Sequence, residues 1–143
     1  MTVANILKSK GGDIISVAAD QTVLEALQVL AEHHIGAVLV LAGKNKIAGI
    51  LSERDVVRAL PHASGKLREQ KVSTIMTKDV ISCDEADSIE TVMAIMTNNK
   101  IRHLPVMKGR TLVGLISIGD VVEARIADAE HEAEALKQYI ATG

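Results

Sequence analysis

The chain has 143 residues, enough for one ordinary domain with a buried core; 48% are hydrophobic, yet it holds no Trp, no Phe and one Tyr. A net charge of −2 with mixed signs argues against a general nucleic-acid binder, and almost no aromatic ring is available for stacking on single strands. The longest apolar run, 35–42, is too short to span a membrane, and the opening residues show no secretory signal. We therefore expect a soluble cytoplasmic protein with neither nucleic acid nor a membrane as partner.

The first half of the chain predicts the order strand, helix, strand, strand, helix. Apolar residues recur at helical spacing after Thr22, a preferred N-cap residue, and the two later strands are rich in β-branched residues around a turn at 42–46. The expected elements are a strand at 14–17, a helix at 22–33, strands at 37–41 and 46–51, and a second helix from Ser52.

The second half repeats this order. The segment DIIS at 13–16 returns as DVIS at 79–82, an offset of 66 residues, and the offset drops to 65 after the turn. The expected elements are a strand at 80–83, a helix at 88–99 capped by Ser88, strands at 103–107 and 111–116, and a second helix from Ser117.

Such self-similarity indicates two copies of one supersecondary unit. One copy alone cannot cover both faces of three short strands, so we expect an α/β (α+β) fold of two pseudo-twofold-related repeats with an extended C-terminal helix. The expected boundaries are 3–60 for the first repeat, 61–71 for a polar linker, 72–126 for the second repeat and 127–143 for the helical extension.

The clearest repeat is GILSERDVV at 49–57, which returns as GLISIGDVV at 114–122; we call each of these two segments a Ser-x-x-Asp phrase. Ser-x-x-Asp at a helix start is a capping box that satisfies two backbone N–H groups and needs no ligand. The same start offers N–H groups that attract phosphate, and a carboxylate one turn on can accept both hydroxyls of a ribose. A phosphate beside a diol is typical of a nucleotide, so both interpretations stay open, and the two can share residues.

These features resemble a tandem pair of cystathionine-β-synthase (CBS) domains, the arrangement called a Bateman module. The resemblance covers roughly residues 3–126. It depends on the element order, on IRHLPV at 101–106, on Gly-h-h-Ser-x-x-Asp-h-h in both copies (h, hydrophobic), and on the Met-Thr pair at 76–77 before KDVIS.

The resemblance implies a stand-alone regulatory module that binds an adenine nucleotide in clefts between the repeats. By match, Ser52 with Asp55 and Ser117 with Asp120 hold ribose and phosphate. The adenine would lie between aliphatic residues and be recognised by backbone groups. The matching positions are Ile14, Ile15, Ser16, Ala37, Val38 and Leu39 in the first copy, with Val80, Ile81, Ser82, Leu104 and Pro105 in the second; each could equally be a core strand residue.

Phosphate also needs positive charge, and here the copies differ. Arg102-His103 of the second copy stands where the first has Gly and Ala, whereas Arg54 and Arg58 of the first stand where the second has Gly and Glu. We take Arg54, Arg102 and His103 as candidate phosphate ligands, with Arg58 and Lys78 as weaker ones. The asymmetry predicts two clefts that differ in affinity or in ligand.

AMP, ADP and ATP are the leading ligands, while NAD(H) and S-adenosylmethionine share their adenosine half. No catalytic constellation is recognisable, because Cys83 has no assignable base and the adjacent His33 and His34 point to different sides of a helix. We therefore expect no catalytic residue, no metal and no enzyme activity. Two rival classes are a small enzyme that uses the nucleotide as substrate and a structural dimerisation module with no ligand.

The C-terminal helix carries an apolar seam spaced 4, 3, 4, 3, 4, which is typical of a short coiled coil. The seam residues are Val122, Ile126, Ala129, Ala133, Leu136 and Ile140. The seam predicts a homodimer contact, although the helix could instead pack on its own module. No effector domain is recognisable in this sequence, so we expect the regulated partner to be a separate protein.

Overall fold

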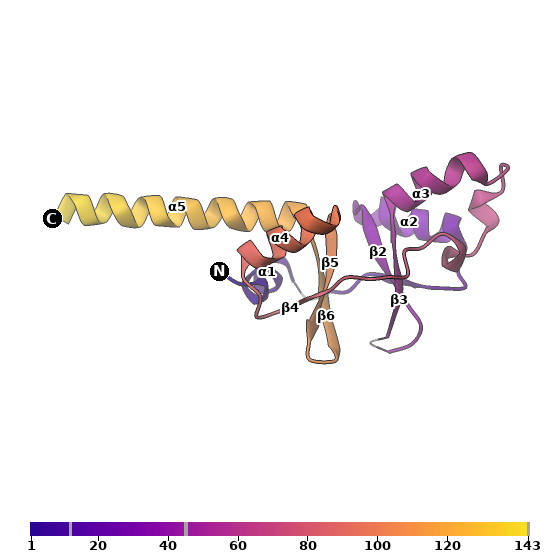
Figure 1. Ribbon diagram of the computed structural model, residues 1–143, viewed down its shortest axis with the longest axis horizontal. Helices are drawn as coiled ribbons and strands as arrows, with labels where there is room; N and C mark the ends of the chain where they lie inside the picture. Colours follow the sequence, from indigo (N-terminus) through magenta and orange to yellow (C-terminus); the bar gives the residue numbers. More distant parts are fainter. Residues whose placement is uncertain (12, 45, 143) are drawn as a thin grey trace. The chain divides into compact units, whose positions relative to one another are not determined.

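The computed structural model describes residues 1–11, 13–44 and 46–142 and divides into two compact units. One, called the Asp55 unit, contains Asp13–Ile81 with Arg110–Leu112. The other, called the Asp120 unit, contains the residues before position 12, Ser82–Gly109 and the chain from Val113 onward. Each unit builds its own three-stranded sheet (Figure 1). The mixed α/β class expected from the sequence is confirmed.

The Asp55 unit holds the sheet β1-β2-β3, in which β1 is parallel and β3 antiparallel to β2. The buried residues Val17, Val38, Val40 and Leu51 of these strands form its core with Ala26 and Leu30 of the following helix. Its elements are β1 (Ser16–Ala18), α2 (Val23–His33), β2 (Ala37–Leu41), β3 (Ile47–Ser52) and α3 (Glu53–Ala59).

The Asp120 unit repeats this design with the sheet β4-β5-β6, in which β4 runs parallel to β5. Its core is formed by buried aliphatic residues such as Ile89, Met96, Leu104 and Ile116. Its elements are α1 (Val3–Lys10), β4 (Cys83–Asp84), α4 (Ile89–Asn99), β5 (His103–Lys108), β6 (Thr111–Ser117) and α5 (Ile118–Thr142). The first two residues of β6, Thr111 and Leu112, are counted with the Asp55 unit.

Most predicted elements are confirmed within one or two residues, but the first strand of each copy begins later than the sequence predicts. The predicted strands at 14–17 and 80–83 are β1 and β4, which begin at Ser16 and Cys83. Ile14 and Ile15 are half-buried, and Ile15 packs against the core of the Asp55 unit without belonging to a strand. Their apolar side chains reflect packing, which the sequence pattern could not distinguish from strand pairing. The turn expected at 42–46 includes residue 45, and the extension at 127–143 includes residue 143; both lie outside the described residues.

The leading segment of each repeat, residues 3–10 of the first and 72–77 of the second, lies in the unit that holds the rest of the other repeat. Val3 donates its N–H to the Asp87 carbonyl at 2.9 Å, which docks α1 against the start of α4 in the Asp120 unit. Val72, at the matching position of the second repeat, donates to the Gln21 carbonyl at 2.8 Å, next to the start of α2 in the Asp55 unit. The sequence repeats and the compact units therefore divide the chain differently.

The segment at 61–71 expected as a linker is packed rather than free. It carries the 3-10 helices Leu60–His62 and Leu67–Glu69, the first of which begins one residue earlier. Leu67 and Ala63 are buried in a small cluster with Val23 of α2. This cluster fixes the connection on the Asp55 unit.

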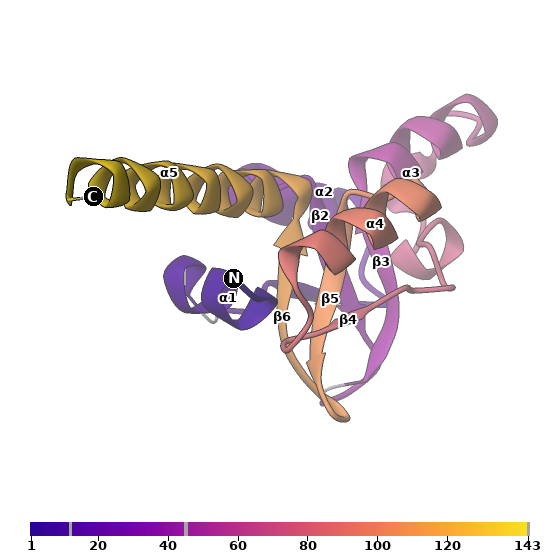
Figure 2. The same ribbon diagram turned by 60° about the vertical axis from the view of Figure 1, so that its left-hand side comes forward.

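Helix α5 extends as one continuous rod past α1 and α4, as Figures 1 and 2 both show. From Ala129 to Thr142 every residue is exposed, including Leu136 at 60% and Ile140 at 69%. The alternative that the seam packs on its own module is therefore wrong for this part of the helix.

Candidate functional site

The first Ser-x-x-Asp phrase forms a closed capping box at the start of α3. The Ser52 N–H donates to Oδ2 of Asp55 at 2.9 Å, and the Asp55 N–H donates to the Ser52 hydroxyl at 3.3 Å. The Ser52 hydroxyl also lies 3.2 Å from the same Asp55 oxygen. The strand β3 ends at Ser52, so the helix begins directly at the sheet edge.

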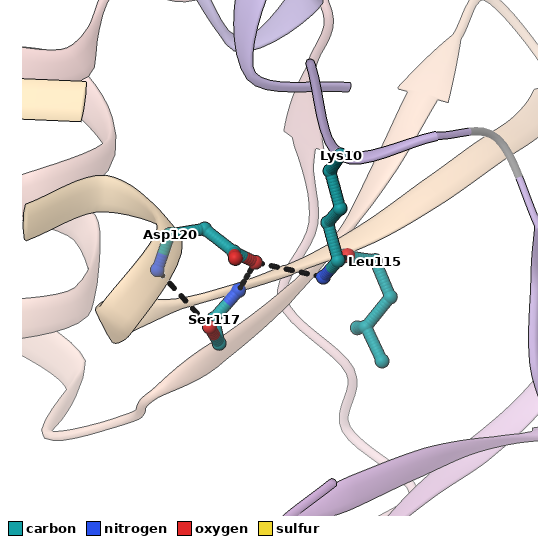
Figure 3. A network of polar contacts seen from close by, with 4 residues as sticks. All are labelled: Lys10, Leu115, Ser117 and Asp120. Carbon is teal, nitrogen blue, oxygen red and sulfur yellow. Dashed lines mark hydrogen bonds and ion pairs between the residues drawn. The ribbon is translucent and has the colours of Figure 1, made fainter. Parts of the chain in front are cut away.

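The second phrase forms the same box at the start of α5 (Figure 3). The Ser117 N–H donates to Oδ2 of Asp120 at 2.8 Å, and the Asp120 N–H donates to the Ser117 hydroxyl at 3.2 Å. The capping interpretation of both phrases is thus confirmed as geometry. A ligand at either site would have to exchange hydrogen bonds with the box.

The first amide of each helix is also engaged. The Glu53 N–H donates to the Gly36 carbonyl at 3.0 Å, and the Ile118 N–H donates to the Arg102 carbonyl at 2.8 Å. Since the third amide of each helix donates to the serine, a phosphate would meet chiefly the second, which in α5 belongs to Gly119. The helix start alone is therefore a weaker anion site than the sequence suggests.

Besides the serine, a second partner residue reaches each aspartate from the leading segment packed on that unit. The Thr77 hydroxyl donates to Oδ1 of Asp55 at 2.9 Å. Lys10 instead donates its Nζ to Oδ2 of Asp120 at 2.7 Å and to the Leu115 carbonyl at 2.9 Å. Asp55 has a neutral partner and Asp120 a cationic one.

The environments of the two carboxylates differ accordingly. Asp55 is 8% exposed, and it is the one charged residue buried in the described part of the chain. Asp120 is partly exposed; burial alone would raise its pKa, but hydrogen bonds from Lys10 and Ser117 outweigh this effect and hold the pKa below its ordinary value. The Asp120 carboxylate is therefore ionised at neutral pH and accessible to solvent.

The glycine that opens each phrase allows a close approach of the leading segment. A Cβ on Gly49 would lie 2.6 Å from the Thr77 carbonyl oxygen and 2.8 Å from Sδ of Met76. A Cβ on Gly114 would lie 2.6 Å from Cδ2 of Leu7. The glycines therefore help to hold Thr77 and Lys10 near the aspartates.

Sequence reasoning did not identify Thr77 or Lys10 as partners of these aspartates. Thr77 was noted as part of the family's Met-Thr pair, without a role. The match of VANIL at 3–7 with VSTIM at 72–76 contained the signal, because it places both residues just after equivalent segments.

The candidate phosphate ligands divide between the units. Arg54 is exposed at the second position of α3, beside Asp55. Arg102 is exposed, and its carbonyl contact with Ile118 places it at the start of α5, with half-buried His103 next to it. The weaker candidates Arg58 and Lys78 are both exposed.

Five of the eleven candidate adenine-pocket residues are buried in the cores. Ala37, Val38, Leu39 and Leu104 are at most 1% exposed, so their side chains fill the cores and only their backbone could recognise a base. Pro105 is likewise buried. The more accessible members of the set are Ile14, Ile15, Ser16, Val80, Ile81 and Ser82.

The remaining reactive side chains have structural surroundings. Burial, followed by the charges of Asp87 and Asp84, raises the pKa of Cys83 to about 12, so the thiol stays protonated. His34 adopts the left-handed conformation that ends α2, and Nδ1 of His33 lies 3.0 Å from the Val29 carbonyl. Within residues 1–11, 13–44 and 46–142 no group of three metal-ligating side chains is found, and no helix there is long and apolar enough to cross a membrane.

Two matches to the CBS domain model, at residues 3–62 and 72–127, cover most of the chain. The chain therefore belongs to the CBS-domain family and contains a pair of these domains. A relative, the mitochondrial CBS domain-containing protein CBSX3 of Arabidopsis thaliana, is 33% identical over 99% of this chain and 73% of its own length.

Solved structures agree with this assignment. The CBS-domain containing protein ATU1752 from Agrobacterium tumefaciens is 40% identical, with a TM-score of 0.84 over 87% of this chain and 99% of that one. The CBS domain pair of protein MJ0100, solved in complex with 5′-methylthioadenosine and S-adenosyl-L-methionine, is 23% identical with a TM-score of 0.78 over 90% of this chain and 98% of that one. At that identity the likeness shows the fold alone.

Proposed function

We propose that this CBS pair is a regulatory module that binds an adenine nucleotide, AMP, ADP or ATP, and signals to a separate effector protein rather than catalysing a reaction. The observation that carries the proposal is the paired Ser-x-x-Asp geometry, which sets a carboxylate and a hydroxyl together at the starts of α3 and α5. The adenosine ligands of the MJ0100 pair support the same ligand class.

In this proposal Asp55 and Asp120 accept the ribose hydroxyls, because one carboxylate can accept from two vicinal donors. Ser52 and Ser117 turn from the capping box toward the ribose or phosphate. Phosphate charge is met by the basic candidates, and the base lies against the candidate adenine set. NAD(H) and S-adenosylmethionine are the alternative ligands because they share the adenosine half. The candidate residues are Ser52, Arg54, Asp55, Arg102, His103, Ser117 and Asp120.

A second candidate function is a structural dimerisation module that binds no ligand. One observation favours it: both oxygens of Asp55 already accept hydrogen bonds from within the chain. A site satisfied in this way does not require a ligand to explain its buried charge.

A thermal-shift screen against AMP, ADP, ATP, NAD⁺, NADH, S-adenosylmethionine and GTP separates the two. A ligand at 100 times its Kd stabilises by about 2.7 kcal/mol, which raises the melting temperature by several degrees. We expect adenosine compounds to shift it and GTP not to. Asp120→Asn should reduce the shift, whereas Asp20→Asn, at an exposed aspartate outside both phrases, should not. If no compound raises the melting temperature, the structural function holds instead.

The module should also form a homodimer. The exposed seam of α5 presents large apolar side chains, and burying them against a second copy would be favourable. Sedimentation of the wild type and of Leu136→Glu tests this: the wild type should sediment as a dimer at micromolar concentration and the variant as a species of 15.2 kDa. A wild type that sediments as a monomer would exclude the homodimer.

A further inference from the structure

The two aspartates differ in the charge of the donor that the leading segment supplies. Thr77 brings a neutral hydroxyl to Asp55. Lys10 brings an ammonium group to Asp120, as Figure 3 shows. The Lys10–Asp120 ion pair, at 2.7 Å, has both the distance and the alignment of a charge-assisted hydrogen bond. A second basic residue, Arg102, lies at the same helix start through its carbonyl contact with Ile118. The positive charge in direct contact with Asp120 is that of Lys10.

The ion pair is placed where it can open. The side chain of Lys10 is 42% exposed and that of Asp120 is 21% exposed. The lysine stem is long and flexible, and its other partner, the Leu115 carbonyl, is neutral. Asp55, by contrast, is nearly enclosed and both of its oxygens accept hydrogen bonds from neutral donors. Asp120 is the carboxylate that an incoming ribose reaches more easily.

A ribose diol bound by both oxygens of Asp120 donates to Oδ1 and Oδ2, and at Oδ2 it competes with Lys10. The displaced ammonium then loses its anion, and only a ligand that carries its own negative charge replaces it. A 5′-phosphate lies on the same ribose and so within the range of a flexible lysine. An uncharged 5′-substituent leaves the loss uncompensated, and a cationic sulfonium adds a repulsion.

We propose that Lys10 makes the Ser117–Asp120 site selective for nucleoside phosphates over uncharged or cationic adenosine ligands. The inference rests on the proposed function and deepens it by naming the ligand class. In this arrangement Lys10 passes from Asp120 to the phosphate as the ribose binds. The site thus binds AMP in preference to 5′-methylthioadenosine and S-adenosylmethionine.

The test follows each site separately by NMR. The amide N–H of Gly119 reports on the Asp120 site. The amide N–H of Gly36 reports on the Asp55 site, because the carbonyl of the same residue accepts from the Glu53 N–H. AMP, 5′-methylthioadenosine and S-adenosylmethionine are titrated into the full chain and into three variants. Lys10→Met removes the charge, Lys10→Arg keeps it, and Lys8→Met removes an exposed lysine of the same helix as a control.

In the wild type we expect AMP to bind about tenfold or more tightly than 5′-methylthioadenosine at Gly119, the scale of one charge-assisted hydrogen bond. Lys10→Met should abolish this preference: 5′-methylthioadenosine should bind more tightly, since Asp120 no longer has to be released, and AMP should gain no such advantage because it also loses the contact of Lys10 with its phosphate. Lys10→Arg should retain the preference, and Lys8→Met should match the wild type.

Other results overturn the inference in distinguishable ways. Equal losses for both ligands in Lys10→Met, or no preference in the wild type, would refute selectivity by Lys10 while the proposed function survives. Ligand shifts at Gly36 with none at Gly119 would do the same. If no adenosine compound moves either amide, the proposed function itself fails. Urea unfolding of each variant confirms that the binding changes occur in folded protein.

Discussion

The two glycines that open the repeated phrase should differ sharply in their tolerance of alanine. Neither Gly49 nor Gly114 has its backbone in the left-handed region, so a Cβ is limited only by its neighbours. At both positions the nearest atom would be 2.6 Å away, short of ordinary contact at 3.4 Å by 3.4 − 2.6 = 0.8 Å. The neighbours must therefore move, and the two neighbours are not equally free to do so.

At Gly49 the obstacle is the backbone carbonyl of Thr77. This carbonyl accepts from the Ile50 N–H at 2.9 Å, and the Thr77 N–H donates to the Ile50 carbonyl at 2.8 Å, so its position is fixed on β3. At Gly114 the obstacle is Cδ2 of Leu7, the end of a side chain that can rotate. We expect Gly49→Ala to lower the free energy of unfolding by about 2–3 kcal/mol, the upper part of the range for overpacking.

Gly114→Ala should lower the free energy of unfolding by about 1 kcal/mol or less, because the leucine side chain can rotate away from the contact. Alanine also reduces the conformational entropy of the unfolded chain, which offsets about 0.4–1 kcal/mol of the loss. Urea unfolding followed by circular dichroism measures both variants against the wild type. Equal losses, or a Gly49→Ala variant within about 0.5 kcal/mol of the wild type, would show that the leading segments are not held as described.

Three further predictions follow from the same contacts. Thr77→Val keeps the shape but removes the donor to Asp55 and should cost about 1.5–3 kcal/mol of unfolding free energy in urea, while Thr77→Ser should cost far less; equal losses would contradict the hydrogen bond. Because the pKa of Asp120 is lowered by folding, its contribution to stability is present above the unfolded value of about 3.9 and is lost as the pH falls below it; the stability gap between wild type and Asp120→Asn should shrink between pH 6 and pH 3. Cys83 should react with iodoacetamide at pH 8 only after unfolding, and rapid alkylation of the native protein would contradict its burial.

The sequence was sufficient to predict the fold because the same order of elements occurs in both repeats. Two matching sets of weak signals fix element order and boundaries better than either set does alone. The N-caps Thr22 and Ser88 show this, because each begins its helix one residue later, as a cap should. Both capping boxes were likewise predicted from residues only three apart.

The contacts that distinguish the two sites were beyond the sequence. Lys10 and Asp120 are 110 residues apart, and Thr77 and Asp55 are 22 apart, so no local periodicity connects them. Both contacts depend on the exchange of leading segments between the units. The alignment of the repeats pairs equivalent residues of the two copies. The exchange instead brings a residue of one copy into contact with the aspartate of the other, Lys10 with Asp120 and Thr77 with Asp55, and these contacts appear only in the structure.

The exchange of leading segments can itself be tested with two equivalent isoleucines. Ile6 of α1 is 6% exposed in the core of the Asp120 unit, and Ile75, its match in the second repeat, packs against the core of the Asp55 unit. Ile6→Ala should cost about 2–5 kcal/mol and Ile75→Ala less, because Ile75 is only partly buried. Hydrogen exchange should show protection lost in β5, β6 and α4 for Ile6→Ala, and in β2, β3 and α2 for Ile75→Ala. If each substitution instead loosens the unit that holds the rest of its own repeat, the segments are not exchanged, and Lys10 cannot be the partner of Asp120.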